Sequence, residues 1–433
     1  MPVATCRGDL LFFWPLTYIF HLMTDPNASL ASAARQRLDR LDGFLREDPS
    51  NNALLIDAFE TALSCGEWER ARFHLRHGQT LLDEPLAWRL REGDFWLAQQ
   101  RYDEALEVLE ALAKTPAPPP GLTEVLLHNL AFIELRRGRY ADCVNRLAPM
   151  LEADQGLGPG ADGRPPVTNR ALQQVWLRAL HHDGQLDRAM DWARKAEQLN
   201  SLDVQAAGVA SLIAVDASDF AAAQRWSAAS LNDGSPADHP VESLVSQASI
   251  ALAARDAGRA IQFADAALKR QPEDGRAWSM RGFAALLAND LPGARAAFLK
   301  AVAAMPQHIG TWHGLGWTQI VQGDLAAAHS SFNTALALDR NFAESHGGLA
   351  VVLALQSKRE MAAEHAELAL RLDRANLSGR YAQALLSGEV KDASEVQRFA
   401  RRLLGGRVGL LDGDMGDIFA PEATPPSSSV DNS

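Results

Sequence analysis

The sequence predicts an all-α fold: an α-solenoid of about nine helix-turn-helix repeats, each of roughly 34 residues, with helical caps. The first observation is an internal repeat between residues 275 and 340. Five residues recur there at an offset of 34, since Trp278, Gly282, Ala294, Phe298 and Ala301 return as Trp312, Gly316, Ala328, Phe332 and Ala335. The second observation is composition, 47% hydrophobic with 4 Tyr, which is typical of an Ala-rich helical protein with a large core. A unit of this size cannot bury its apolar face alone, so the units must stack.

The chain begins with an apolar segment, residues 1–27. Its centre, residues 10–23, reads LLFFWPLTYIFHLM and could serve as a secretory signal or membrane anchor. Asp9 and Pro15 argue against that interpretation, and the apolar run is too short to span a bilayer. Translation from Met23 would leave most of the segment out. We therefore expect a cytoplasmic protein, with inner-membrane association or export as the alternative if residues 1–23 are translated.

The helical part starts with a capping helix, expected at residues 28–51, where leucines recur on one side of an amphipathic segment. Nine repeats follow, beginning near residues 52, 86, 124, 170, 203, 241, 275, 309 and 343. A turn glycine with a small residue five positions later marks several of them, as in Gly66 with Ala71 and Gly184 with Ala189. These pairs keep the register where large aromatic residues are missing.

Changes in composition indicate a loop within the repeat array and the end of the array. A Gly- and Pro-rich stretch, residues 158–169, is expected to be a loop between an N-terminal block at 52–157 and a C-terminal block at 170–376. Residues 377–404 carry enough apolar side chains for capping helices. The last segment, 405–433, is predicted to be disordered from its composition.

The repeat that begins at residue 275 carries the pattern of a known family. It combines these residues: Trp278, Arg281-Gly282, Ala285, Ala294, Phe298, Ala301 and Pro306. This pattern resembles the tetratricopeptide repeat (TPR) family, most specifically over residues 241–376 and less so upstream. The resemblance implies a right-handed superhelix that binds partners on its concave face.

In that family the concave face is lined from fixed positions of each first helix. Carried onto this sequence, the apolar residues at those positions form the candidate partner-binding set: Phe283, Leu286, Leu287, His313, Trp317, Ile320, Val321, Val351 and Leu355. Lys and Asn, which clamp a peptide carboxylate in some family members, are replaced by residues such as Ser279 and Phe283. Trp317 is the leading anchor candidate, because it follows Gly316 on the side opposite Trp312. The alternative is that these side chains are ordinary core between repeats.

The corresponding upstream positions are more polar. They comprise Asp94, His128, Arg136, Gln174, Arg178, His181 and His182. Such a set is either a second recognition patch or a solvated face.

Charge and motifs limit the possible functions. The net charge of −12 argues against nucleic acid as the main partner, because a phosphate-binding face needs a basic stripe. We find no P-loop, dinucleotide-binding turn, nucleophile elbow or paired metal-ligand motif, so we expect neither enzymatic activity nor a cofactor or metal. The sequence therefore predicts a non-enzymatic adaptor for protein or peptide segments.

Two other functions remain open. In one, residues 10–23 attach an assembly factor of an envelope or secretion machine to a membrane. In the other, the apolar groove acts as a holdase-type secretion chaperone. The tail segment 410–419 alternates apolar and acidic residues, and self-docking of this segment is a further possibility.

Overall fold

The computed structural model describes residues 28–81, 85–116, 118–119, 121–152, 167–232 and 239–389. Within these ranges the regular structure consists of 20 helices and contains no strand. The predictions for residues 1–27 and 405–433, including the proposed docking segment 410–419, lie outside the described residues. So do most of the predicted loop 158–169 and all but the first helix of the predicted C-terminal caps.

The chain divides into two compact units, residues 1–213 and 214–433, which we call the N-terminal and C-terminal units. The first contains α2 (Ala28–Glu47), α3 (Asn52–Ser64), α4 (Trp68–Thr80), α5 (Pro85–Ala98), α6 (Tyr102–Ala113), α7 (Leu122–Arg136), α8 (Tyr140–Leu151), α9 (Val167–His182), α10 (Leu186–Gln198) and most of α11 (Val204–Asp216). The second contains α12 (Phe220–Leu231), α13 (Val241–Ala253), α14 (Ala257–Arg270), α15 (Gly275–Leu287), α16 (Leu291–Ala304), α17 (Ile309–Val321), α18 (Leu325–Leu338), α19 (Ala343–Leu355), α20 (Arg359–Leu372) and α21 (Leu377–Ser387).

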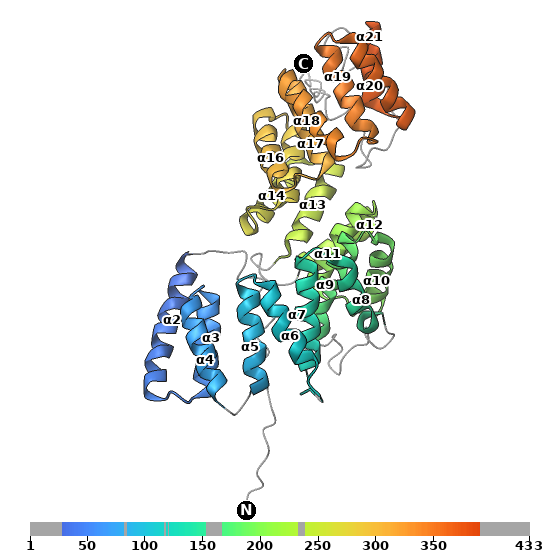
Figure 1. The fold of residues 1–433 in the computed structure, drawn as a ribbon. Coiled ribbons are helices and arrows are strands. Elements are labelled where there is room, and N and C mark those ends of the chain that lie inside the picture. Colours follow the sequence, from blue (N-terminus) through green and yellow to red (C-terminus); the bar gives the residue numbers. More distant parts are fainter. Residues whose placement is uncertain are drawn as a thin grey trace, which may run out of the picture. The chain divides into compact units, whose positions relative to one another are not determined.

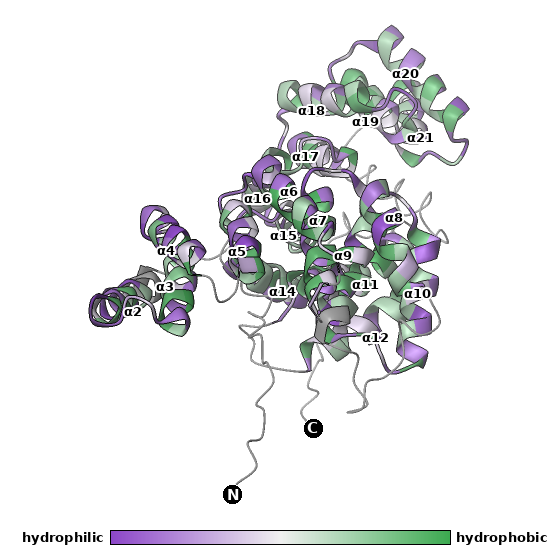
Figure 2. Cartoon of the chain, turned by 60° about the horizontal axis from the view of Figure 1, so that its bottom comes forward, coloured by the Kyte–Doolittle hydropathy of each residue, from purple (hydrophilic) through white to green (hydrophobic). Residues whose placement is uncertain are grey.

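Helices α3 to α20 follow one another as nine helix-turn-helix repeats, such as α15 with α16 (Figure 1). The first helices of the last four repeats begin within one residue of the expected positions 241, 275, 309 and 343. The largest difference is three residues, at α9, which begins at Val167 instead of 170. The predicted all-α solenoid is therefore confirmed. Figure 2 shows hydrophilic and hydrophobic residues on different sides of helices such as α10, as expected when one face packs on neighbouring helices.

Aspartates begin most second helices of the C-terminal unit. The carboxylates of Asp219, Asp256, Asp290 and Asp324 each accept a hydrogen bond from the backbone N–H three residues later, at the starts of α12, α14, α16 and α18. Such caps satisfy a donor that the helix itself leaves unpaired. At the start of α20 the equivalent residue is Lys358, whose side chain makes no capping bond.

The core of the C-terminal unit depends on two buried rings, Phe298 and Phe332, both 0% exposed. A Cβ atom added at Gly316 would lie 2.7 Å from the Phe332 ring, and one added at Gly348 would lie 2.1 Å from it. Phe332 therefore occupies a slot between a glycine of its own repeat and a glycine of the next. Phe298 lies in the same way between Gly282 and Gly314. The sequence pattern identified the glycine on one side of each slot but not the glycine on the other.

Candidate partner-binding surface

A partly exposed apolar surface lies where three successive first helices end. Leu287, Val321 and Leu355 are the last residues of α15, α17 and α19, so each stands one repeat after the previous one. Val321 is 44% exposed and Leu355 is 40% exposed, while Leu287 is half-buried. We call these three residues the apolar stripe. Because the three residues occupy the same helical position, an apolar side chain recurs at the end of each of these first helices.

The other six predicted residues are less accessible. Phe283, Trp317 and Ile320 are half-buried. Leu286 is 9% exposed, His313 8% and Val351 0%. Val351 belongs to a buried cluster with Ala366 and Ala382, which come from α20 and α21. The structure therefore brings part of the predicted set to the surface and places the rest within the packing between repeats.

Trp317 is partly a packing residue. Its ring meets Phe332 edge-on, with centroids 5.8 Å apart and an interplanar angle of 82°. Its indole N–H donates a hydrogen bond of 3.1 Å to Glu344 Oε1 in the next repeat. Replacing Trp317 by Ala would thus remove contacts between repeats as well as exposed surface, so this variant is a poor probe of partner binding alone.

Glu344 is the centre of a polar cluster that sequence reasoning did not find. Besides Trp317, the amide of Asn376 donates to its Oε2 at 3.0 Å and the hydroxyl of Ser378 donates to its Oε1 at 2.5 Å. Burial raises the pKa of the Glu344 carboxyl, although these hydrogen bonds act in the opposite direction. Three donors hold this carboxylate, so its role is to join α17, α19 and the start of α21. Only its position, the second residue of a first helix, was visible in the sequence.

His313 lies beside this cluster. Its Nε2 atom is 2.8 Å from the Ser345 hydroxyl, and its ring centroid is 5.3 Å from that of Phe342. Burial lowers the pKa of His313 to about 4. The imidazole is therefore neutral near pH 7 and contributes to packing, and it does not provide a positive charge for a ligand.

Comparison with known proteins identifies the repeat. A family model described as "Tetratricopeptide repeat" matches residues 245–309 and 313–376. Residues 245–376 of the chain are therefore tetratricopeptide repeats. Repeats of this kind generally mediate interactions between proteins as scaffolds.

Solved structures align with the chain at low sequence identity, and no curated protein matches the chain. The human IFIT1 dimer with m7Gppp-AAAA aligns with a TM-score of 0.50 and 14% identity over 85% of this chain and 88% of that chain. The APC/C hetero-tetramer Cut9-Hcn1 gives a TM-score of 0.35 and 14% identity, covering 82% and 79%. MamA gives 0.33 and 17%, covering 37% and 92%. The likeness to IFIT1 concerns the fold alone.

The helices of the N-terminal unit carry a polar network at the predicted upstream patch. Asn129 on α7 donates to Asp94 Oδ1 on α5 at 3.1 Å, and His128 Nδ1 lies 3.1 Å from Asn129 Oδ1. Arg91, one turn before Asp94, lies 3.5 Å from Glu60 on α3. Burial raises the pKa of Asp94 to about 7. Polar side chains thus link three successive first helices, α3, α5 and α7, in the N-terminal unit. The apolar stripe of the C-terminal unit has only apolar side chains.

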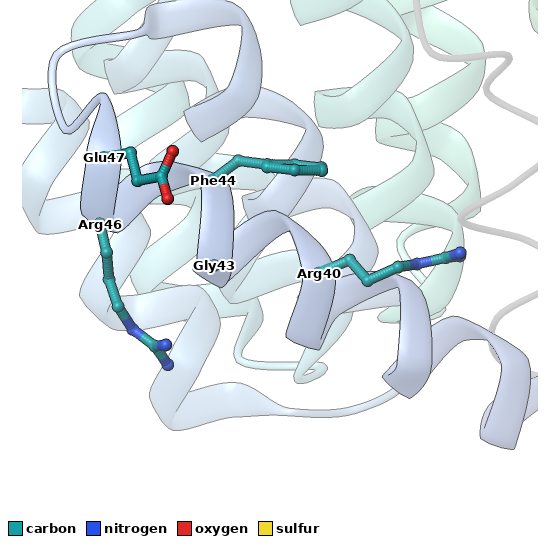
Figure 3. A pocket seen from close by; sticks show the side chains of 5 residues that line it. All are labelled: Arg40, Gly43, Phe44, Arg46 and Glu47. Carbon is teal, nitrogen blue, oxygen red and sulfur yellow. The ribbon is translucent and has the colours of Figure 1, made fainter.

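Other features offer little for chemistry. A hollow beside α2 is lined by Arg40, Gly43, Phe44, Arg46 and Glu47, whose side chains spread apart (Figure 3). Cys65 and Cys143 are buried free thiols, and burial raises the pKa of Cys143 to about 12. Within the described ranges there is no group of three or more His, Cys, Asp or Glu side chains able to hold a metal ion. None of the helices described is both long and apolar enough to cross a membrane.

Proposed function

We propose that this TPR protein is a non-enzymatic adaptor that binds an apolar or amphipathic segment of a partner protein along the apolar stripe. The observation that carries the proposal is the exposure of Val321 and Leu355 at equivalent positions of consecutive repeats. Large apolar side chains left exposed in a regular row favour a protein partner over a small ligand.

The half-buried residues next to the stripe would form the floor of the surface. Phe283, Trp317 and Ile320 are partly buried and pack against the hydrophobic core clusters of the C-terminal unit. Their positions are therefore fixed by packing before a partner binds. A rigid floor lowers the entropy lost on association. Covering the exposed parts of Val321 and Leu355 would contribute about 1 kcal/mol each, since full burial of such a side chain contributes about 1.5–3 kcal/mol.

The test compares the wild-type chain with the double variant Val321→Ser and Leu355→Ser as baits in a native lysate, with retained proteins measured by quantitative mass spectrometry. A true partner should be retained at least about tenfold less by the variant, which corresponds to a loss of about 1.4 kcal/mol. Both substituted side chains are only partly exposed, so the variant should melt at a modestly lower temperature by circular dichroism, and helicity at the binding temperature should be unchanged.

A matched control is available on second helices. Leu299 on α16 is 49% exposed and Leu372 on α20 is 43% exposed, and neither belongs to the stripe. The Leu299→Ser and Leu372→Ser double variant removes similar apolar surface and should retain the same partners as wild type. Equal losses in both variants would indicate nonspecific hydrophobic capture, and equal retention by all three baits would exclude the stripe as the binding site.

The same baits separate the two alternative functions. A holdase-type chaperone would suppress aggregation of many unfolded clients and would lose this activity in the stripe variant without losing one particular partner. A membrane-associated assembly factor would depend on residues 10–23, so a chain starting at Met23 would lose its partners while keeping the stripe intact.

A further inference from the structure

In the three repeats that begin at residues 275, 309 and 343, the side chain of the fourth residue of the first helix makes an equivalent hydrogen bond. The indole N–H of Trp278 donates to the carbonyl of Pro272 at 2.7 Å, and that of Trp312 donates to the carbonyl of Pro306 at 2.9 Å. In each case the acceptor lies six residues earlier. At this position the next repeat has His346, whose Nε2 atom lies 2.9 Å from the carbonyl oxygen of Arg340.

This bond fixes the tautomer of His346. A carbonyl oxygen can only accept, so Nε2 must carry the hydrogen. In a neutral imidazole the other nitrogen, Nδ1, then has a free lone pair and must act as an acceptor. That atom lies 2.9 Å from Nδ1 of His365 on α20, with ring centroids 5.2 Å apart and a 30° tilt. His365 must therefore donate from its Nδ1–H.

The paired imidazoles are specific to this repeat among the three that begin at 275, 309 and 343. The residues equivalent to His365 are Ala297 and Ser331, and the residues equivalent to His346 are tryptophans. Burial, followed by the charge of His346, lowers the pKa of His365, and His329 on α18 acts in the same direction. Glu364, adjacent on α20, acts oppositely and is exposed.

We propose that His346 and His365 form a pH-sensitive latch that closes α19 on α20 near neutral pH and opens in mildly acidic solution. With one proton on the pair, an N–H of the charged ring still donates to Nδ1 of the neutral ring, so the hydrogen bond persists. When both rings are protonated, two N–H groups face each other and neither nitrogen can accept. Once both rings are charged, the bond is replaced by repulsion.

The latch does not depend on the proposed function, but its consequence does. Helix α19 carries Leu355, one end of the apolar stripe, and Glu344, which holds Trp317. Opening of α19 from α20 would therefore loosen the end of the stripe. Acid would weaken partner binding at that end, whereas opening of the latch itself can be measured with no partner present.

The experiment is hydrogen exchange of the full-length chain between pH 7.5 and 5.5, read by mass spectrometry and corrected for intrinsic exchange rates. Protection in residues 343–372 should fall about tenfold relative to residues 275–304, the effect of one pKa unit of unfavourable interaction. The reference segment contains no histidine, so it reports any general effect of acid. Equal changes in the two segments would overturn the proposal.

The matched variant combines His346→Trp with His365→Ser, which gives this repeat the residues that the preceding repeat has at Trp312 and Ser331. It keeps a donor for the Arg340 carbonyl and leaves His313 and His329 in place. Its relative protection should not change between pH 7.5 and 5.5. A fall as large as in wild type would show that other groups cause the effect.

A second measurement takes its decisive result from the wild-type chain and needs a variant only to assign the resonances. Titration of the imidazole Cε1–H resonances by NMR should show two coupled histidines whose protonation steps are separated by at least one pH unit. The single variant His365→Ser assigns them, since one resonance disappears and the other titrates in a single step. Two independent titrations at the same pH in wild type would refute the latch.

Discussion

Repeats 309–342 and 343–376 have first helices of 13 residues and second helices of 14 residues, yet their polar contacts differ. Gln322 is the C-cap residue that follows the first helix of the earlier repeat. Its amide donates to the carbonyl of Leu291 at 3.0 Å, and its Oε1 accepts from Arg295 at 3.2 Å. Gln356 makes the equivalent bond to the Leu325 carbonyl at 3.1 Å, but its buried Oε1 has no partner.

The reason is the residue at the position of Arg295. In the next repeat it is His329, whose Nδ1 instead lies 2.9 Å from the amide nitrogen of Asn333. Arg295 also pairs with Asp324 at 2.8 Å, and the residue equivalent to Asp324 is Lys358. The slot of Phe332 reaches into the later repeat through Gly348, although Ala366 stands at the position of Phe332 there, while the polar contacts of Gln322 are not reproduced. The packing that sets the distance between helices and the hydrogen bonding of nearby polar groups can therefore vary independently from one repeat to the next.

The largest expected effect concerns the shared geometry. Gly348→Leu would force a side chain into the space of the fully buried Phe332 ring and should destabilise the C-terminal unit by about 3 kcal/mol or more. Thermal unfolding followed by circular dichroism measures this loss. Gly43→Ala, where an added Cβ meets nothing within 4 Å, is the control and should stabilise its helix by roughly 0.5–1 kcal/mol. A stable Gly348→Leu chain would contradict the slot.

The second prediction concerns His313, which the later repeat replaces with Gly347. The folded pKa of about 4 is below the unfolded value of 6.5, so the unfolded chain takes up the proton first as the pH falls. Stability is therefore full above pH 6.5 and is lost toward pH 4, by about 2 kcal/mol between pH 7 and 5. Urea unfolding at several pH values measures the slope. In His313→Asn the free energy of unfolding should fall by about 2 kcal/mol less between pH 7 and 5 than in wild type. An unchanged pH dependence would assign the acid sensitivity to other groups.

The third prediction gives the later repeat the missing cap. Lys358→Asp should stabilise α20 by about 1 kcal/mol, because an aspartate at this position accepts a backbone N–H and favours the positive end of the helix dipole. In the earlier repeat, Asp324→Ala should have the opposite effect and destabilise the chain, because it removes both the cap and the ion pair with Arg295. Differential scanning calorimetry of both variants tests the pair. Destabilisation by Lys358→Asp would show that contacts of the lysine side chain stabilise the chain more than the new cap does.

The smallest effect is expected from His329→Arg, which would offer Gln356 Oε1 the donor that Arg295 gives to Gln322. A new hydrogen bond to a charged donor at a partly exposed site should add about 0.5–1 kcal/mol. Combined with Lys358→Asp, it should also form the ion pair that Arg295 makes with Asp324, so the two changes together should exceed their sum. Strict additivity in a double-mutant cycle would show that the ion pair does not form.

The sequence by itself determined the helical repeat and its register. Trp278 and Phe298 recur as Trp312 and Phe332 in the next repeat, because a helix pair of fixed length must fill the same space at the same position. Turn glycines and capping aspartates act within a few residues of their own position. Their effects could therefore be deduced without knowledge of the neighbouring repeats.

Only the tertiary structure decided which of the predicted site residues are exposed. Val321 and Val351 have the same chemistry and both stand on a first helix, yet one is 44% exposed and the other fully buried, because α20 and α21 cover the second. The Glu344 cluster takes donors from Asn376 and Ser378, which lie beyond α20 in the chain, and the latch joins His346 to His365 across a helix pair. Exposure and pairing of this kind depend on how each repeat winds onto the next, and many weak contacts across the interface set that winding.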